Sequence, residues 1–361
     1  MVIEEVYREL ARKLDSFPQG FPAARNGLEL DILRWIFTPA EAAIAIDLSP
    51  APEPVSVIAE RLGKSEEATE AILDDMRLKC QTLCLIIGGK HCYLLPPFFP
   101  GFHEGQVVRP DKTIEERREY TRMYEEYYPQ LLKTLGGFAP ALTRVVPVSA
   151  AVEPGLRIHR IDDVRRIIEA SKSIFLMECV CRKEKALYGQ TCKHSLEVCM
   201  ALSDQEEMLS NWPYGRVIPV EEAIEVAIKA EKEGLVHTTY NADESGVTFL
   251  CACCPCCSGF LSGLAKYKAP YIVTRSNFVA WIDETTCERC GICANERCPM
   301  GAIEEHDGYR VEPKRCIGCG VCTSTCPTGA IRLIRMPDSE LESLPSGMGD
   351  WAVQRMGERG M

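Results

Sequence analysis

The chain has 361 residues, 20 cysteines and a formal net charge of −11, so it is long enough for two or three domains with their own cores. The acidic balance argues against nucleic acid as a partner, because such binding needs Lys and Arg to neutralise phosphates. The first residues lack the apolar run of a signal peptide, and no stretch of about 18 apolar residues could span a membrane. We therefore expect a cytoplasmic protein whose thiols stay reduced and available as metal ligands.

Residues 1–110 carry the pattern of a winged-helix domain. An amphipathic helix is predicted over Val2–Leu14. A capping box with proline at the first helical position, Thr38–Glu41, starts a helix that runs to Ile46. Two further helices and the two strands of a hairpin are predicted over 55–62, 65–77, 83–87 and 92–95. This order of helix, turn, helix and wing is typical of small transcription regulators.

The charge of this domain favours a docking or structural role over DNA binding. Residues 28–95 contain 11 acidic and 6 basic side chains. An acidic recognition helix would be repelled by the phosphates that line a DNA groove. The three cysteines near the hairpin, Cys80, Cys84 and Cys92, are expected to be small buried apolar side chains.

A long charged helix over Thr113–Leu135 dominates the predicted connector, residues 111–156. Four tyrosines at helical spacing along it predict packing rather than a cofactor site. Gly136 and Gly137 end the helix. A mixed, cysteine-rich domain is expected over residues 157–270, beginning near Arg157.

The cysteine-rich domain places nine thiols beside its predicted strands. A helix (161–170) and a buried strand (173–177) lead into Cys179-Val180-Cys181, where an extended chain would point both sulfurs the same way. A helix (220–233) and a strand (246–250) lead into the second concentration. The nine residues are Cys179, Cys181, Cys192, Cys199, Cys251, Cys253, Cys254, Cys256 and Cys257.

Metal binding is the expected role of these nine thiols, because disulfides between immediate neighbours are strained. Iron–sulfur clusters are favoured over zinc, since electron-transfer motifs occur in the same chain. The simplest scheme gives one [4Fe-4S] cluster, cluster 3, to Cys179, Cys181, Cys192 and Cys199. It gives another, cluster 4, to four of the five later residues Cys251, Cys253, Cys254, Cys256 and Cys257. In a second scheme both groups converge on one larger or non-cubane cluster.

Two copies of one cysteine motif follow each other between Asp283 and Ile334. Three closely spaced thiolates can bind three irons of a cubane, and in the bacterial pattern the fourth ligand comes from the other copy. The ligands of cluster 1 are then Cys287, Cys290, Cys293 and Cys326. The ligands of cluster 2 are Cys316, Cys319, Cys322 and Cys298.

Structural zinc is the alternative for this segment. A zinc ion needs only four cysteines, however, and would not require two sets of three closely spaced cysteines, each followed by a more distant cysteine that precedes a proline, Cys298 or Cys326. One departure from the usual spacing is an extra residue between Cys293 and Cys298. It predicts a bulge in that loop, which would leave the ligation intact and change the surroundings of cluster 1.

The two copies resemble the two-cluster bacterial-type ferredoxin module, over about one seventh of the chain. The order of elements along the whole chain resembles a group of anaerobe proteins that bind 4Fe-4S diclusters. The phrases that carry this resemblance are Phe37–Ala42, Leu95–Phe98, Glu178–Glu184 and Ser276–Ala280. It implies [4Fe-4S] cofactors and electron transfer. Neither a G-x-G-x-x-G that opens a helix nor a P-loop is present, so flavin or nicotinamide chemistry is not indicated.

We expect an α+β fold with a winged-helix domain, the cysteine-rich middle domain, a ferredoxin module over 271–336 and a tail over 337–361. The tail, which contains Trp351, has no obvious core partner and is expected to dock on a neighbouring subunit, in a homo-oligomer or a complex. The expected function is multi-cluster electron transfer, as an accessory subunit, donor or acceptor of an anaerobic oxidoreductase. Two alternatives stay open: a reductase with an open iron in the middle site, and a redox-sensing transcription regulator.

Overall fold

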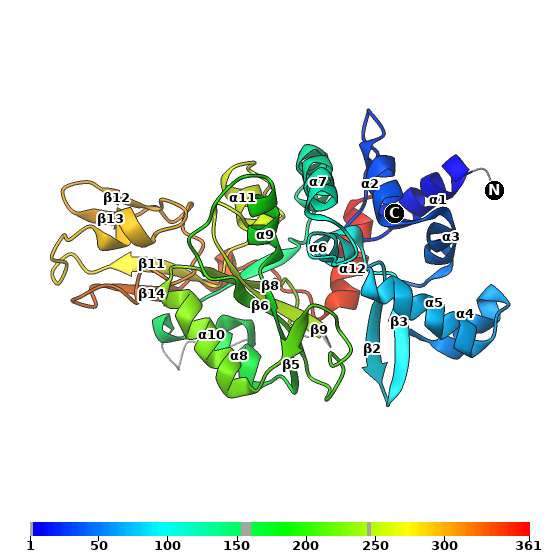
Figure 1. Ribbon diagram of the computed structural model, residues 1–361. Helices are drawn as coiled ribbons and strands as arrows, with labels where there is room; N and C mark the ends of the chain where they lie inside the picture. Colours follow the sequence, from blue (N-terminus) through cyan, green and yellow to red (C-terminus); the bar gives the residue numbers. More distant parts are fainter. Residues whose placement is uncertain (1–2, 153–159, 244–246) are drawn as a thin grey trace.

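The computed structural model describes residues 3–152, 160–243 and 247–361. The molecule is elongated, with the N-terminal helices at one end and the two copies of the cysteine motif at the other (Figure 1). Three expected boundaries, at Val2, Arg157 and Gly246, lie outside the described residues.

Residues 3–94 form helices followed by a small sheet. The elements are α1 (Ile3–Asp15), α2 (Leu28–Ile36), α3 (Pro39–Asp47), β1 (Glu53–Pro54), α4 (Val55–Leu62), α5 (Glu66–Leu78), β2 (Leu83–Ile87) and β3 (Lys90–Leu94). The strand order is β1-β3-β2. Thr38 and Glu41 form the predicted capping box, in which Glu41 N donates to Thr38 Oγ1 at 3.3 Å and Thr38 N donates to a Glu41 carboxylate oxygen at 2.7 Å. Cys84 and Cys92 are buried, whereas Cys80 is half-buried.

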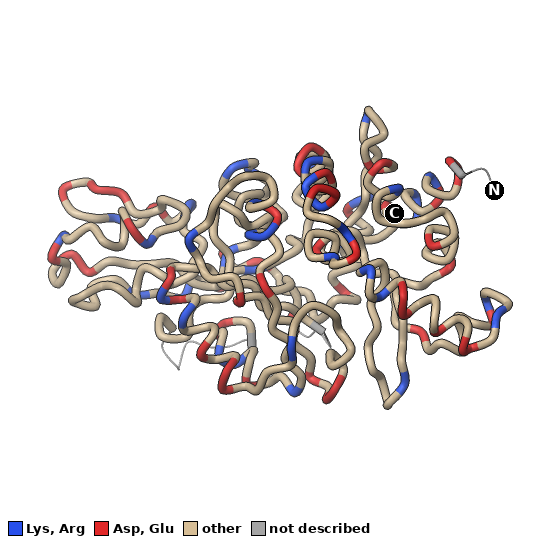
Figure 2. The backbone as a smooth tube through the Cα atoms, viewed as in Figure 1, with Lys and Arg blue, Asp and Glu red and all other residues tan. Residues whose placement is uncertain are grey.

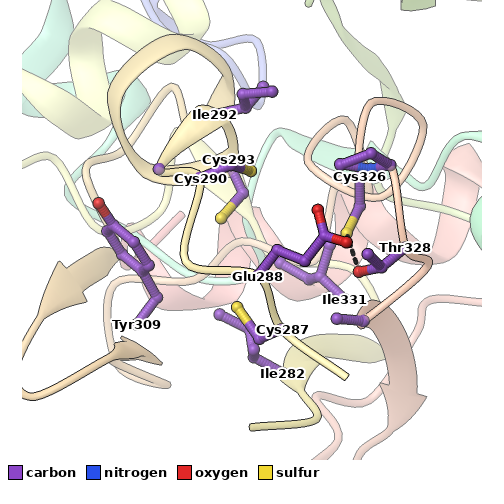
Figure 3. Close-up of a pocket in the computed structure, with 13 residues that line it drawn as sticks. Ile282, Cys287, Glu288, Cys290, Ile292, Cys293, Tyr309, Cys326, Thr328 and Ile331 are labelled. Atoms are coloured by element: carbon purple, nitrogen blue, oxygen red, sulfur yellow. Dashed lines mark hydrogen bonds between the residues drawn. The ribbon is translucent and has the colours of Figure 1, made fainter. Parts of the chain in front are cut away.

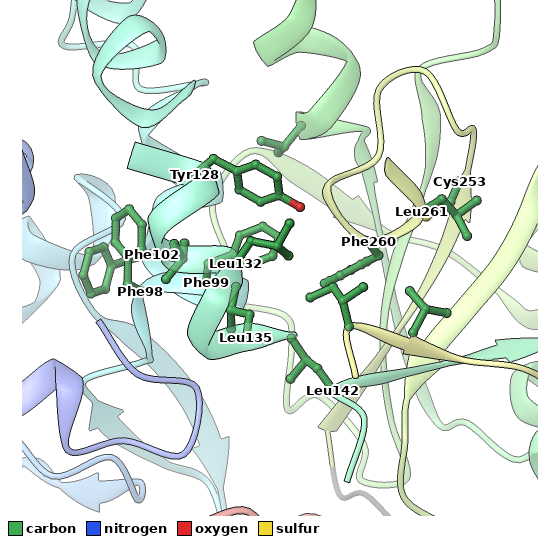
Figure 4. Packing of buried hydrophobic residues seen from close by; sticks show 14 of the residues in the cluster. Phe98, Phe99, Phe102, Tyr128, Leu132, Leu135, Leu142, Cys253, Phe260 and Leu261 are labelled. Carbon is green, nitrogen blue, oxygen red and sulfur yellow. The ribbon is translucent and has the colours of Figure 1, made fainter. Parts of the chain in front are cut away.

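The long helix α7 (Ile114–Leu135) joins the N-terminal region to the rest of the chain. It follows the short helix α6 (His103–Gln106) and begins with a second capping box, at Thr113 and Glu116. Its four tyrosines are buried, as the spacing predicted. Figure 4 shows side chains of α7, among them Tyr128 and Leu132, facing Phe260 and Leu261 of the middle region. The connector therefore packs on both neighbours through one apolar layer.

A seven-stranded sheet forms the centre of the molecule, in the order β10-β4-β8-β9-β6-β5-β7. Its pairs are antiparallel except for β10 with β4. The strands are β4 (Thr143–Val146), β5 (Ser173–Glu178), β6 (Glu197–Ser203), β7 (Gly215–Val217), β8 (Val236–Tyr240), β9 (Val247–Cys253) and β10 (Val273–Thr274). The predicted strand over 246–250 in fact continues to Cys253, so two of the cysteines lie within it.

Helices cover both faces of this sheet. On one face α8 (Val164–Glu169) and α10 (Val220–Lys232) bury alternate side chains of β5, β6 and β9. The helix expected over 161–170 is thus shorter at both ends. On the cysteine side lie α9 (Val180–Leu187) and α11 (Gly259–Ala265) (Figure 1). The intervening strand positions, which include Cys199 and Cys251, point to this side.

The two cysteine motifs lie between β11 (Phe278–Ile282) and β14 (Ile331–Arg335), which pair antiparallel. A hairpin of β12 (Ile303–Glu305) and β13 (Tyr309–Val311) separates the motifs. In the β11–β14 register Ile282 pairs with Ile331. The start of the first motif and the end of the second are therefore neighbours in space.

The expectation that the tail docks on another subunit is wrong for its helix, α12 (Met348–Glu358). Trp351 is 1% exposed and its indole Nε1 donates to the Ala141 carbonyl at 2.9 Å. Arg355 is fully buried and donates to carbonyls near the end of α7. The tail is part of the protein's own core because both large side chains find partners there.

Buried apolar residues from the N-terminal helices, α7, the sheet, the motif region and α12 form one continuous cluster. Residues of the expected regions therefore contact one another across the expected boundaries, while one face of the central sheet has a cluster of its own. Within the described ranges, no helix combines the length and the apolar character needed to cross a membrane.

Candidate metal centres

The first hollow collects the four cysteines expected for cluster 1. It is a space of about 370 Å³ lined by Cys287, Cys290 and Cys293 of the first motif and by Cys326 of the second (Figure 3). Ile282, Tyr309 and Ile331 supply much of the apolar wall. Four sulfurs around an apolar space suit a [4Fe-4S] cluster, which is held by cysteine thiolates.

The second hollow collects the four cysteines expected for cluster 2. Its volume is about 330 Å³, and its sulfurs come from Cys298 of the first motif and from Cys316, Cys319 and Cys322 of the second. Backbone amides approach two of these sulfurs: Ala302 N donates to Cys298 Sγ at 3.1 Å and Ala280 N to Cys316 Sγ at 3.5 Å. Such donors stabilise thiolate charge and tune cluster potentials.

Glycines allow the second motif to curl closely around its hollow. Gly318 has φ +66°, and a Cβ there would lie 2.2 Å from the Phe278 carbonyl oxygen. Gly320 has φ +76°, and its added Cβ would lie 2.6 Å from Ala151. Only glycine fits such a left-handed, closely packed position.

The two hollows differ in their access to solvent. Cys290 in the first is exposed, whereas Cys319 and Cys322 in the second are buried. Burial raises the pKa of the Cys319 thiol to about 12. At Cys326 burial acts in the same direction, but backbone N–H donors from Ile331 and its neighbours outweigh it and lower the pKa. These donors therefore stabilise the Cys326 thiolate.

The extra residue of the first motif forms a π-turn over Cys293–Arg297, in which Cys298 N donates to the Cys293 carbonyl at 3.0 Å. A π-turn is the usual way to insert one residue into a helical turn, so the predicted bulge is present. It projects Arg297 toward α10, where the guanidinium donates to the Glu231 and Lys232 carbonyls at 2.8 and 2.9 Å. These carbonyls end a helix and attract a cation. The insertion thus ties the motif region to the middle region.

Five of the nine middle cysteines lie together on the cysteine side of the sheet; we call Cys179, Cys181, Cys199, Cys251 and Cys253 the five-cysteine group. Cys199 and Cys251 are direct cross-strand partners in the β6–β9 register, and Cys253 follows two residues later on the same face. Cys179 hydrogen-bonds to Cys181 and Cys199, and hydrogen bonds from these two thiols lower its pKa.

Cys181 does not lie on an extended chain, contrary to our expectation. Cys179 is the N-cap of α9, and Cys181 lies in the first turn of that helix. The two sulfurs still meet, because the helix turns the chain back toward Cys179. The Gly259 amide at the start of α11 also donates to the Cys181 thiol.

The other four middle cysteines form a four-cysteine group, whose buried members pack with Cys179 in one cluster. The sulfurs of Cys192, Cys254, Cys256 and Cys257 all lie within 4.8 Å of one another. In the simplest scheme Cys192 joined Cys179, Cys181 and Cys199, and the later run formed cluster 4 alone; both this scheme and the second scheme of one larger cluster stay predictions. Cys192 lies with the later run instead, and Cys251 and Cys253 lie with the earlier group.

Arg182 lies between the two groups and is 2% exposed. It donates to the Ser195 carbonyl at 2.7 Å and to the Ala252 carbonyl at 2.9 Å. Burial opposes its charge, but the nearby Cys179 and Cys254 thiolates outweigh burial and raise its pKa. A buried guanidinium needs such compensation, so this position fits anionic sulfur on both sides.

A buried polar pair that the sequence did not reveal lies beside Cys181. His103 stacks on Tyr124 and contacts Glu184 of α9, Nε2 to Oε2, at 3.1 Å. Burial lowers the pKa of His103 to about 3, while burial and the adjacent Glu125 raise the pKa of Glu184. Glu184 follows the Cys-Arg-Lys phrase in sequence, but no local signal pointed to His103, which comes from α6.

Comparison with known proteins identifies the motif region. Residues 309–332 match a family model described as a 4Fe-4S binding domain. An uncharacterized ferredoxin of Methanocaldococcus jannaschii is 47% identical over 47 residues, 12% of this chain and 28% of that protein. The electron transport protein HydN of Escherichia coli is 43% identical over 56 residues, 15% of this chain and 31% of HydN.

A subunit of a larger enzyme also matches: the indolepyruvate oxidoreductase subunit IorA of Methanothermobacter marburgensis is 45% identical over 51 residues, 14% of this chain and 8% of IorA. The chain thus spans about a third or less of the length of these curated relatives. No solved structure gives a significant match. The chain contains a ferredoxin-type 4Fe-4S binding module, and the matches do not extend to the protein as a whole.

Proposed function

We propose that this protein is a multi-cluster iron–sulfur electron-transfer protein that works with an oxidoreductase, as an accessory subunit, donor or acceptor. The crossed lining of the two hollows carries the proposal: each combines three cysteines of one motif with the Cys-Pro cysteine of the other. [4Fe-4S] clusters at these positions supply one-electron transfer. Two of the matched proteins are, by name, an electron transport protein and an oxidoreductase subunit.

The exposed first hollow is the proposed contact with the redox partner. Cys290 reaches the surface there, while the second hollow lies deeper. Residues 283–310 contain seven acidic and three basic side chains, and acidic positions gather at this end of the molecule (Figure 2). A partner with a basic patch around its own redox group would be steered to this end.

The five-cysteine group is the proposed third iron–sulfur centre. Its thiols contact one another, and Arg182 supplies positive charge that favours thiolates. Five cysteines exceed the four ligands of a cubane, and the His103–Glu184 pair lies beside Cys181. These two observations favour, as a second candidate, a reductase whose middle cluster binds substrate.

The region from α2 to β3 is proposed to be a winged helix that docks on protein rather than DNA. The two cations near the end of α5 are already paired, Arg77 with Asp74 and Lys79 with Glu41. Tyr214 of the middle region donates to the Leu78 carbonyl at the end of α5. The end of the helix is therefore covered by the protein's own chain. DNA binding at low salt in a gel-shift assay, in either oxidation state, would contradict this assignment.

Iron and acid-labile sulfide analysis of the anaerobically purified full chain tests the cluster count. Three cubanes predict about 12 Fe per chain, and Cys179→Ser/Cys199→Ser, which leaves only three cysteines in the five-cysteine group, should remove about four of them. Cys84→Ser, a buried thiol outside both groups, is the control and should leave iron unchanged. A value near 8 Fe in the wild-type protein would refute the proposed third centre, and a value near zero would refute the electron-transfer proposal itself.

A further inference from the structure

The sulfur atoms of the four-cysteine group lie closer together than the four thiolates around a cubane do. Cys192 Sγ lies 3.9 Å from Cys254 Sγ and 4.0 Å from Cys256 Sγ. Cys256 Sγ and Cys257 Sγ are 3.7 Å apart. All four sulfurs lie within 4.8 Å of one another, so they form a compact set.

The size of this compact set matches a single metal ion. A zinc ion binds cysteine sulfur at about 2.3 Å, and the edge of the corresponding tetrahedron of sulfurs is about 3.8 Å. In a cubane each thiolate binds a different iron, so the four sulfurs surround a much larger body. The spacings of 3.7, 3.9 and 4.0 Å therefore fit one ion at the centre.

The same chain provides an internal comparison. Among the described residues, the four-cysteine group is the one set of three or more His, Cys, Asp or Glu whose ligand atoms all lie this close together. The cysteines of the two ferredoxin-type hollows do not meet this criterion and line spaces of about 370 and 330 Å³. The four-cysteine group is thus more compact than the cysteine sets of the two hollows.

The compact site joins two loops that are distant in sequence. Cys192 lies in the loop between α9 and β6, 62 residues before Cys254. Cys254, Cys256 and Cys257 form a turn between β9 and α11, and Ser258 N donates to the Cys254 carbonyl at 3.1 Å before capping α11. A closed set of four protein ligands that links two loops is typical of structural zinc.

Arg182 links the α9–β6 loop to the end of β9 and provides countercharge. Its guanidinium donates to Ser195 in the α9–β6 loop and to Ala252 near the end of β9. Four thiolates around a divalent ion carry about −2 charge, and a buried cation next to Cys254 reduces the repulsion among them. The surroundings therefore suit the anionic tetrathiolate.

We propose that Cys192, Cys254, Cys256 and Cys257 bind a single zinc ion that fastens the α9–β6 loop to the β9–α11 loop beside the five-cysteine group. A tetrahedral all-sulfur site selects zinc when iron is not assembled into a cluster. The site has no role in moving electrons, since zinc has no redox chemistry. The zinc site is a structural role in addition to the proposed electron transfer, and its assignment does not depend on the electron-transfer proposal.

Metal analysis and zinc X-ray absorption of the full-length chain, purified anaerobically after growth with both iron and zinc, test the site. The expected result is one zinc per chain with four sulfur neighbours at about 2.3 Å. This measurement on the wild-type protein needs no variant, so misfolding cannot obscure it. Absence of zinc, or mononuclear iron in its place, would overturn the proposal.

Paired variants then assign the ligands. Cys192→Ser/Cys256→Ser should lose the zinc and keep the iron, whereas Cys290→Ser, which also changes an exposed cysteine, should lose iron and keep the zinc. Loss of iron rather than zinc in the double variant would show a cluster at the compact site and refute the assignment. Failure of the electron-transfer proposal, by contrast, would appear as missing iron with the zinc unchanged.

Discussion

Replacing Arg355 by methionine is expected to release α12 from the rest of the molecule. All five N–H groups of the guanidinium donate to backbone carbonyls, and no carboxylate pairs with Arg355 among the described ion pairs. The acceptors and distances are Pro18 (3.1 Å), Phe138 (2.5 Å), Pro140 (2.9 Å), Thr134 (2.9 Å) and Leu135 (2.7 Å). Methionine keeps the apolar stem and removes every donor.

The size of the effect follows from two opposing terms. Burial, followed by repulsion from Arg359, lowers the pKa of Arg355 from 12.5 to about 10, which corresponds to roughly 3 kcal/mol against the charged form. Hydrogen bonds from a charged donor stabilise the folded protein by about 1.5 kcal/mol each at the low end of their range. We use the low end for the five bonds of Arg355 because they share one guanidinium. The net loss in Arg355→Met is therefore about 4.5 kcal/mol.

Hydrogen exchange followed by mass spectrometry measures this loss directly. Amides of α12 should exchange about 100-fold or more faster in Arg355→Met, while iron content stays at the wild-type value. Gln354→Ala, on the exposed side of the same helix, is the matched control and should exchange as the wild type does. Unchanged protection of α12 in Arg355→Met would refute the view that the carbonyl cage holds the tail.

Three further predictions concern the hollows and the buried pair. Cys326→Ser, a change in the second motif, should remove the cluster of the first hollow, and Cys298→Ser, a change in the first motif, should remove the cluster of the second hollow; each variant should lose about four irons. If EPR spectra show instead that each change damages the cluster bound by the three cysteines of the same motif, the crossed ligand assignment is wrong. Gly318→Ala should lose the second cluster, because its Cβ would overlap a β11 carbonyl, whereas Gly329→Ala, with φ +67° and open space around it, should keep the cluster and lose only about 1 kcal/mol. Burial lowers the pKa of His103, so its contribution to the free energy of unfolding is fully present above pH 6.5 and falls by about 1.4 kcal/mol per pH unit as the pH drops toward 3. The difference in thermal stability between pH 7.5 and pH 5.5 should therefore be smaller in His103→Gln than in the wild type. An equal difference in the two proteins would contradict this prediction.

Local features of the chain were readable from the sequence because their partners are close in number. Thr38 and Glu41 cap a helix from three residues apart, and the extra residue before Cys298 leads to a π-turn. The two copies of the cysteine motif predicted the sets that line the two hollows, since the repeat itself relates each triplet to the remote cysteine.

The grouping of the nine middle cysteines was decided by the tertiary structure. Cys199 lies opposite Cys251 because of the register between β6 and β9, and no spacing along the chain determines such a register. Cys192 joins Cys254 because the α9–β6 loop comes close to the turn between β9 and α11, a contact between segments that are distant along the chain.

The place of the tail was likewise decided in three dimensions. A sequence cannot show that the carbonyls near the end of α7 would surround Arg355. Spacing therefore determined which chemistry the chain contains, iron–sulfur in a repeated motif. Packing determined which sulfurs meet, because contacts between distant segments depend on strand register and loop closure rather than on neighbours along the chain.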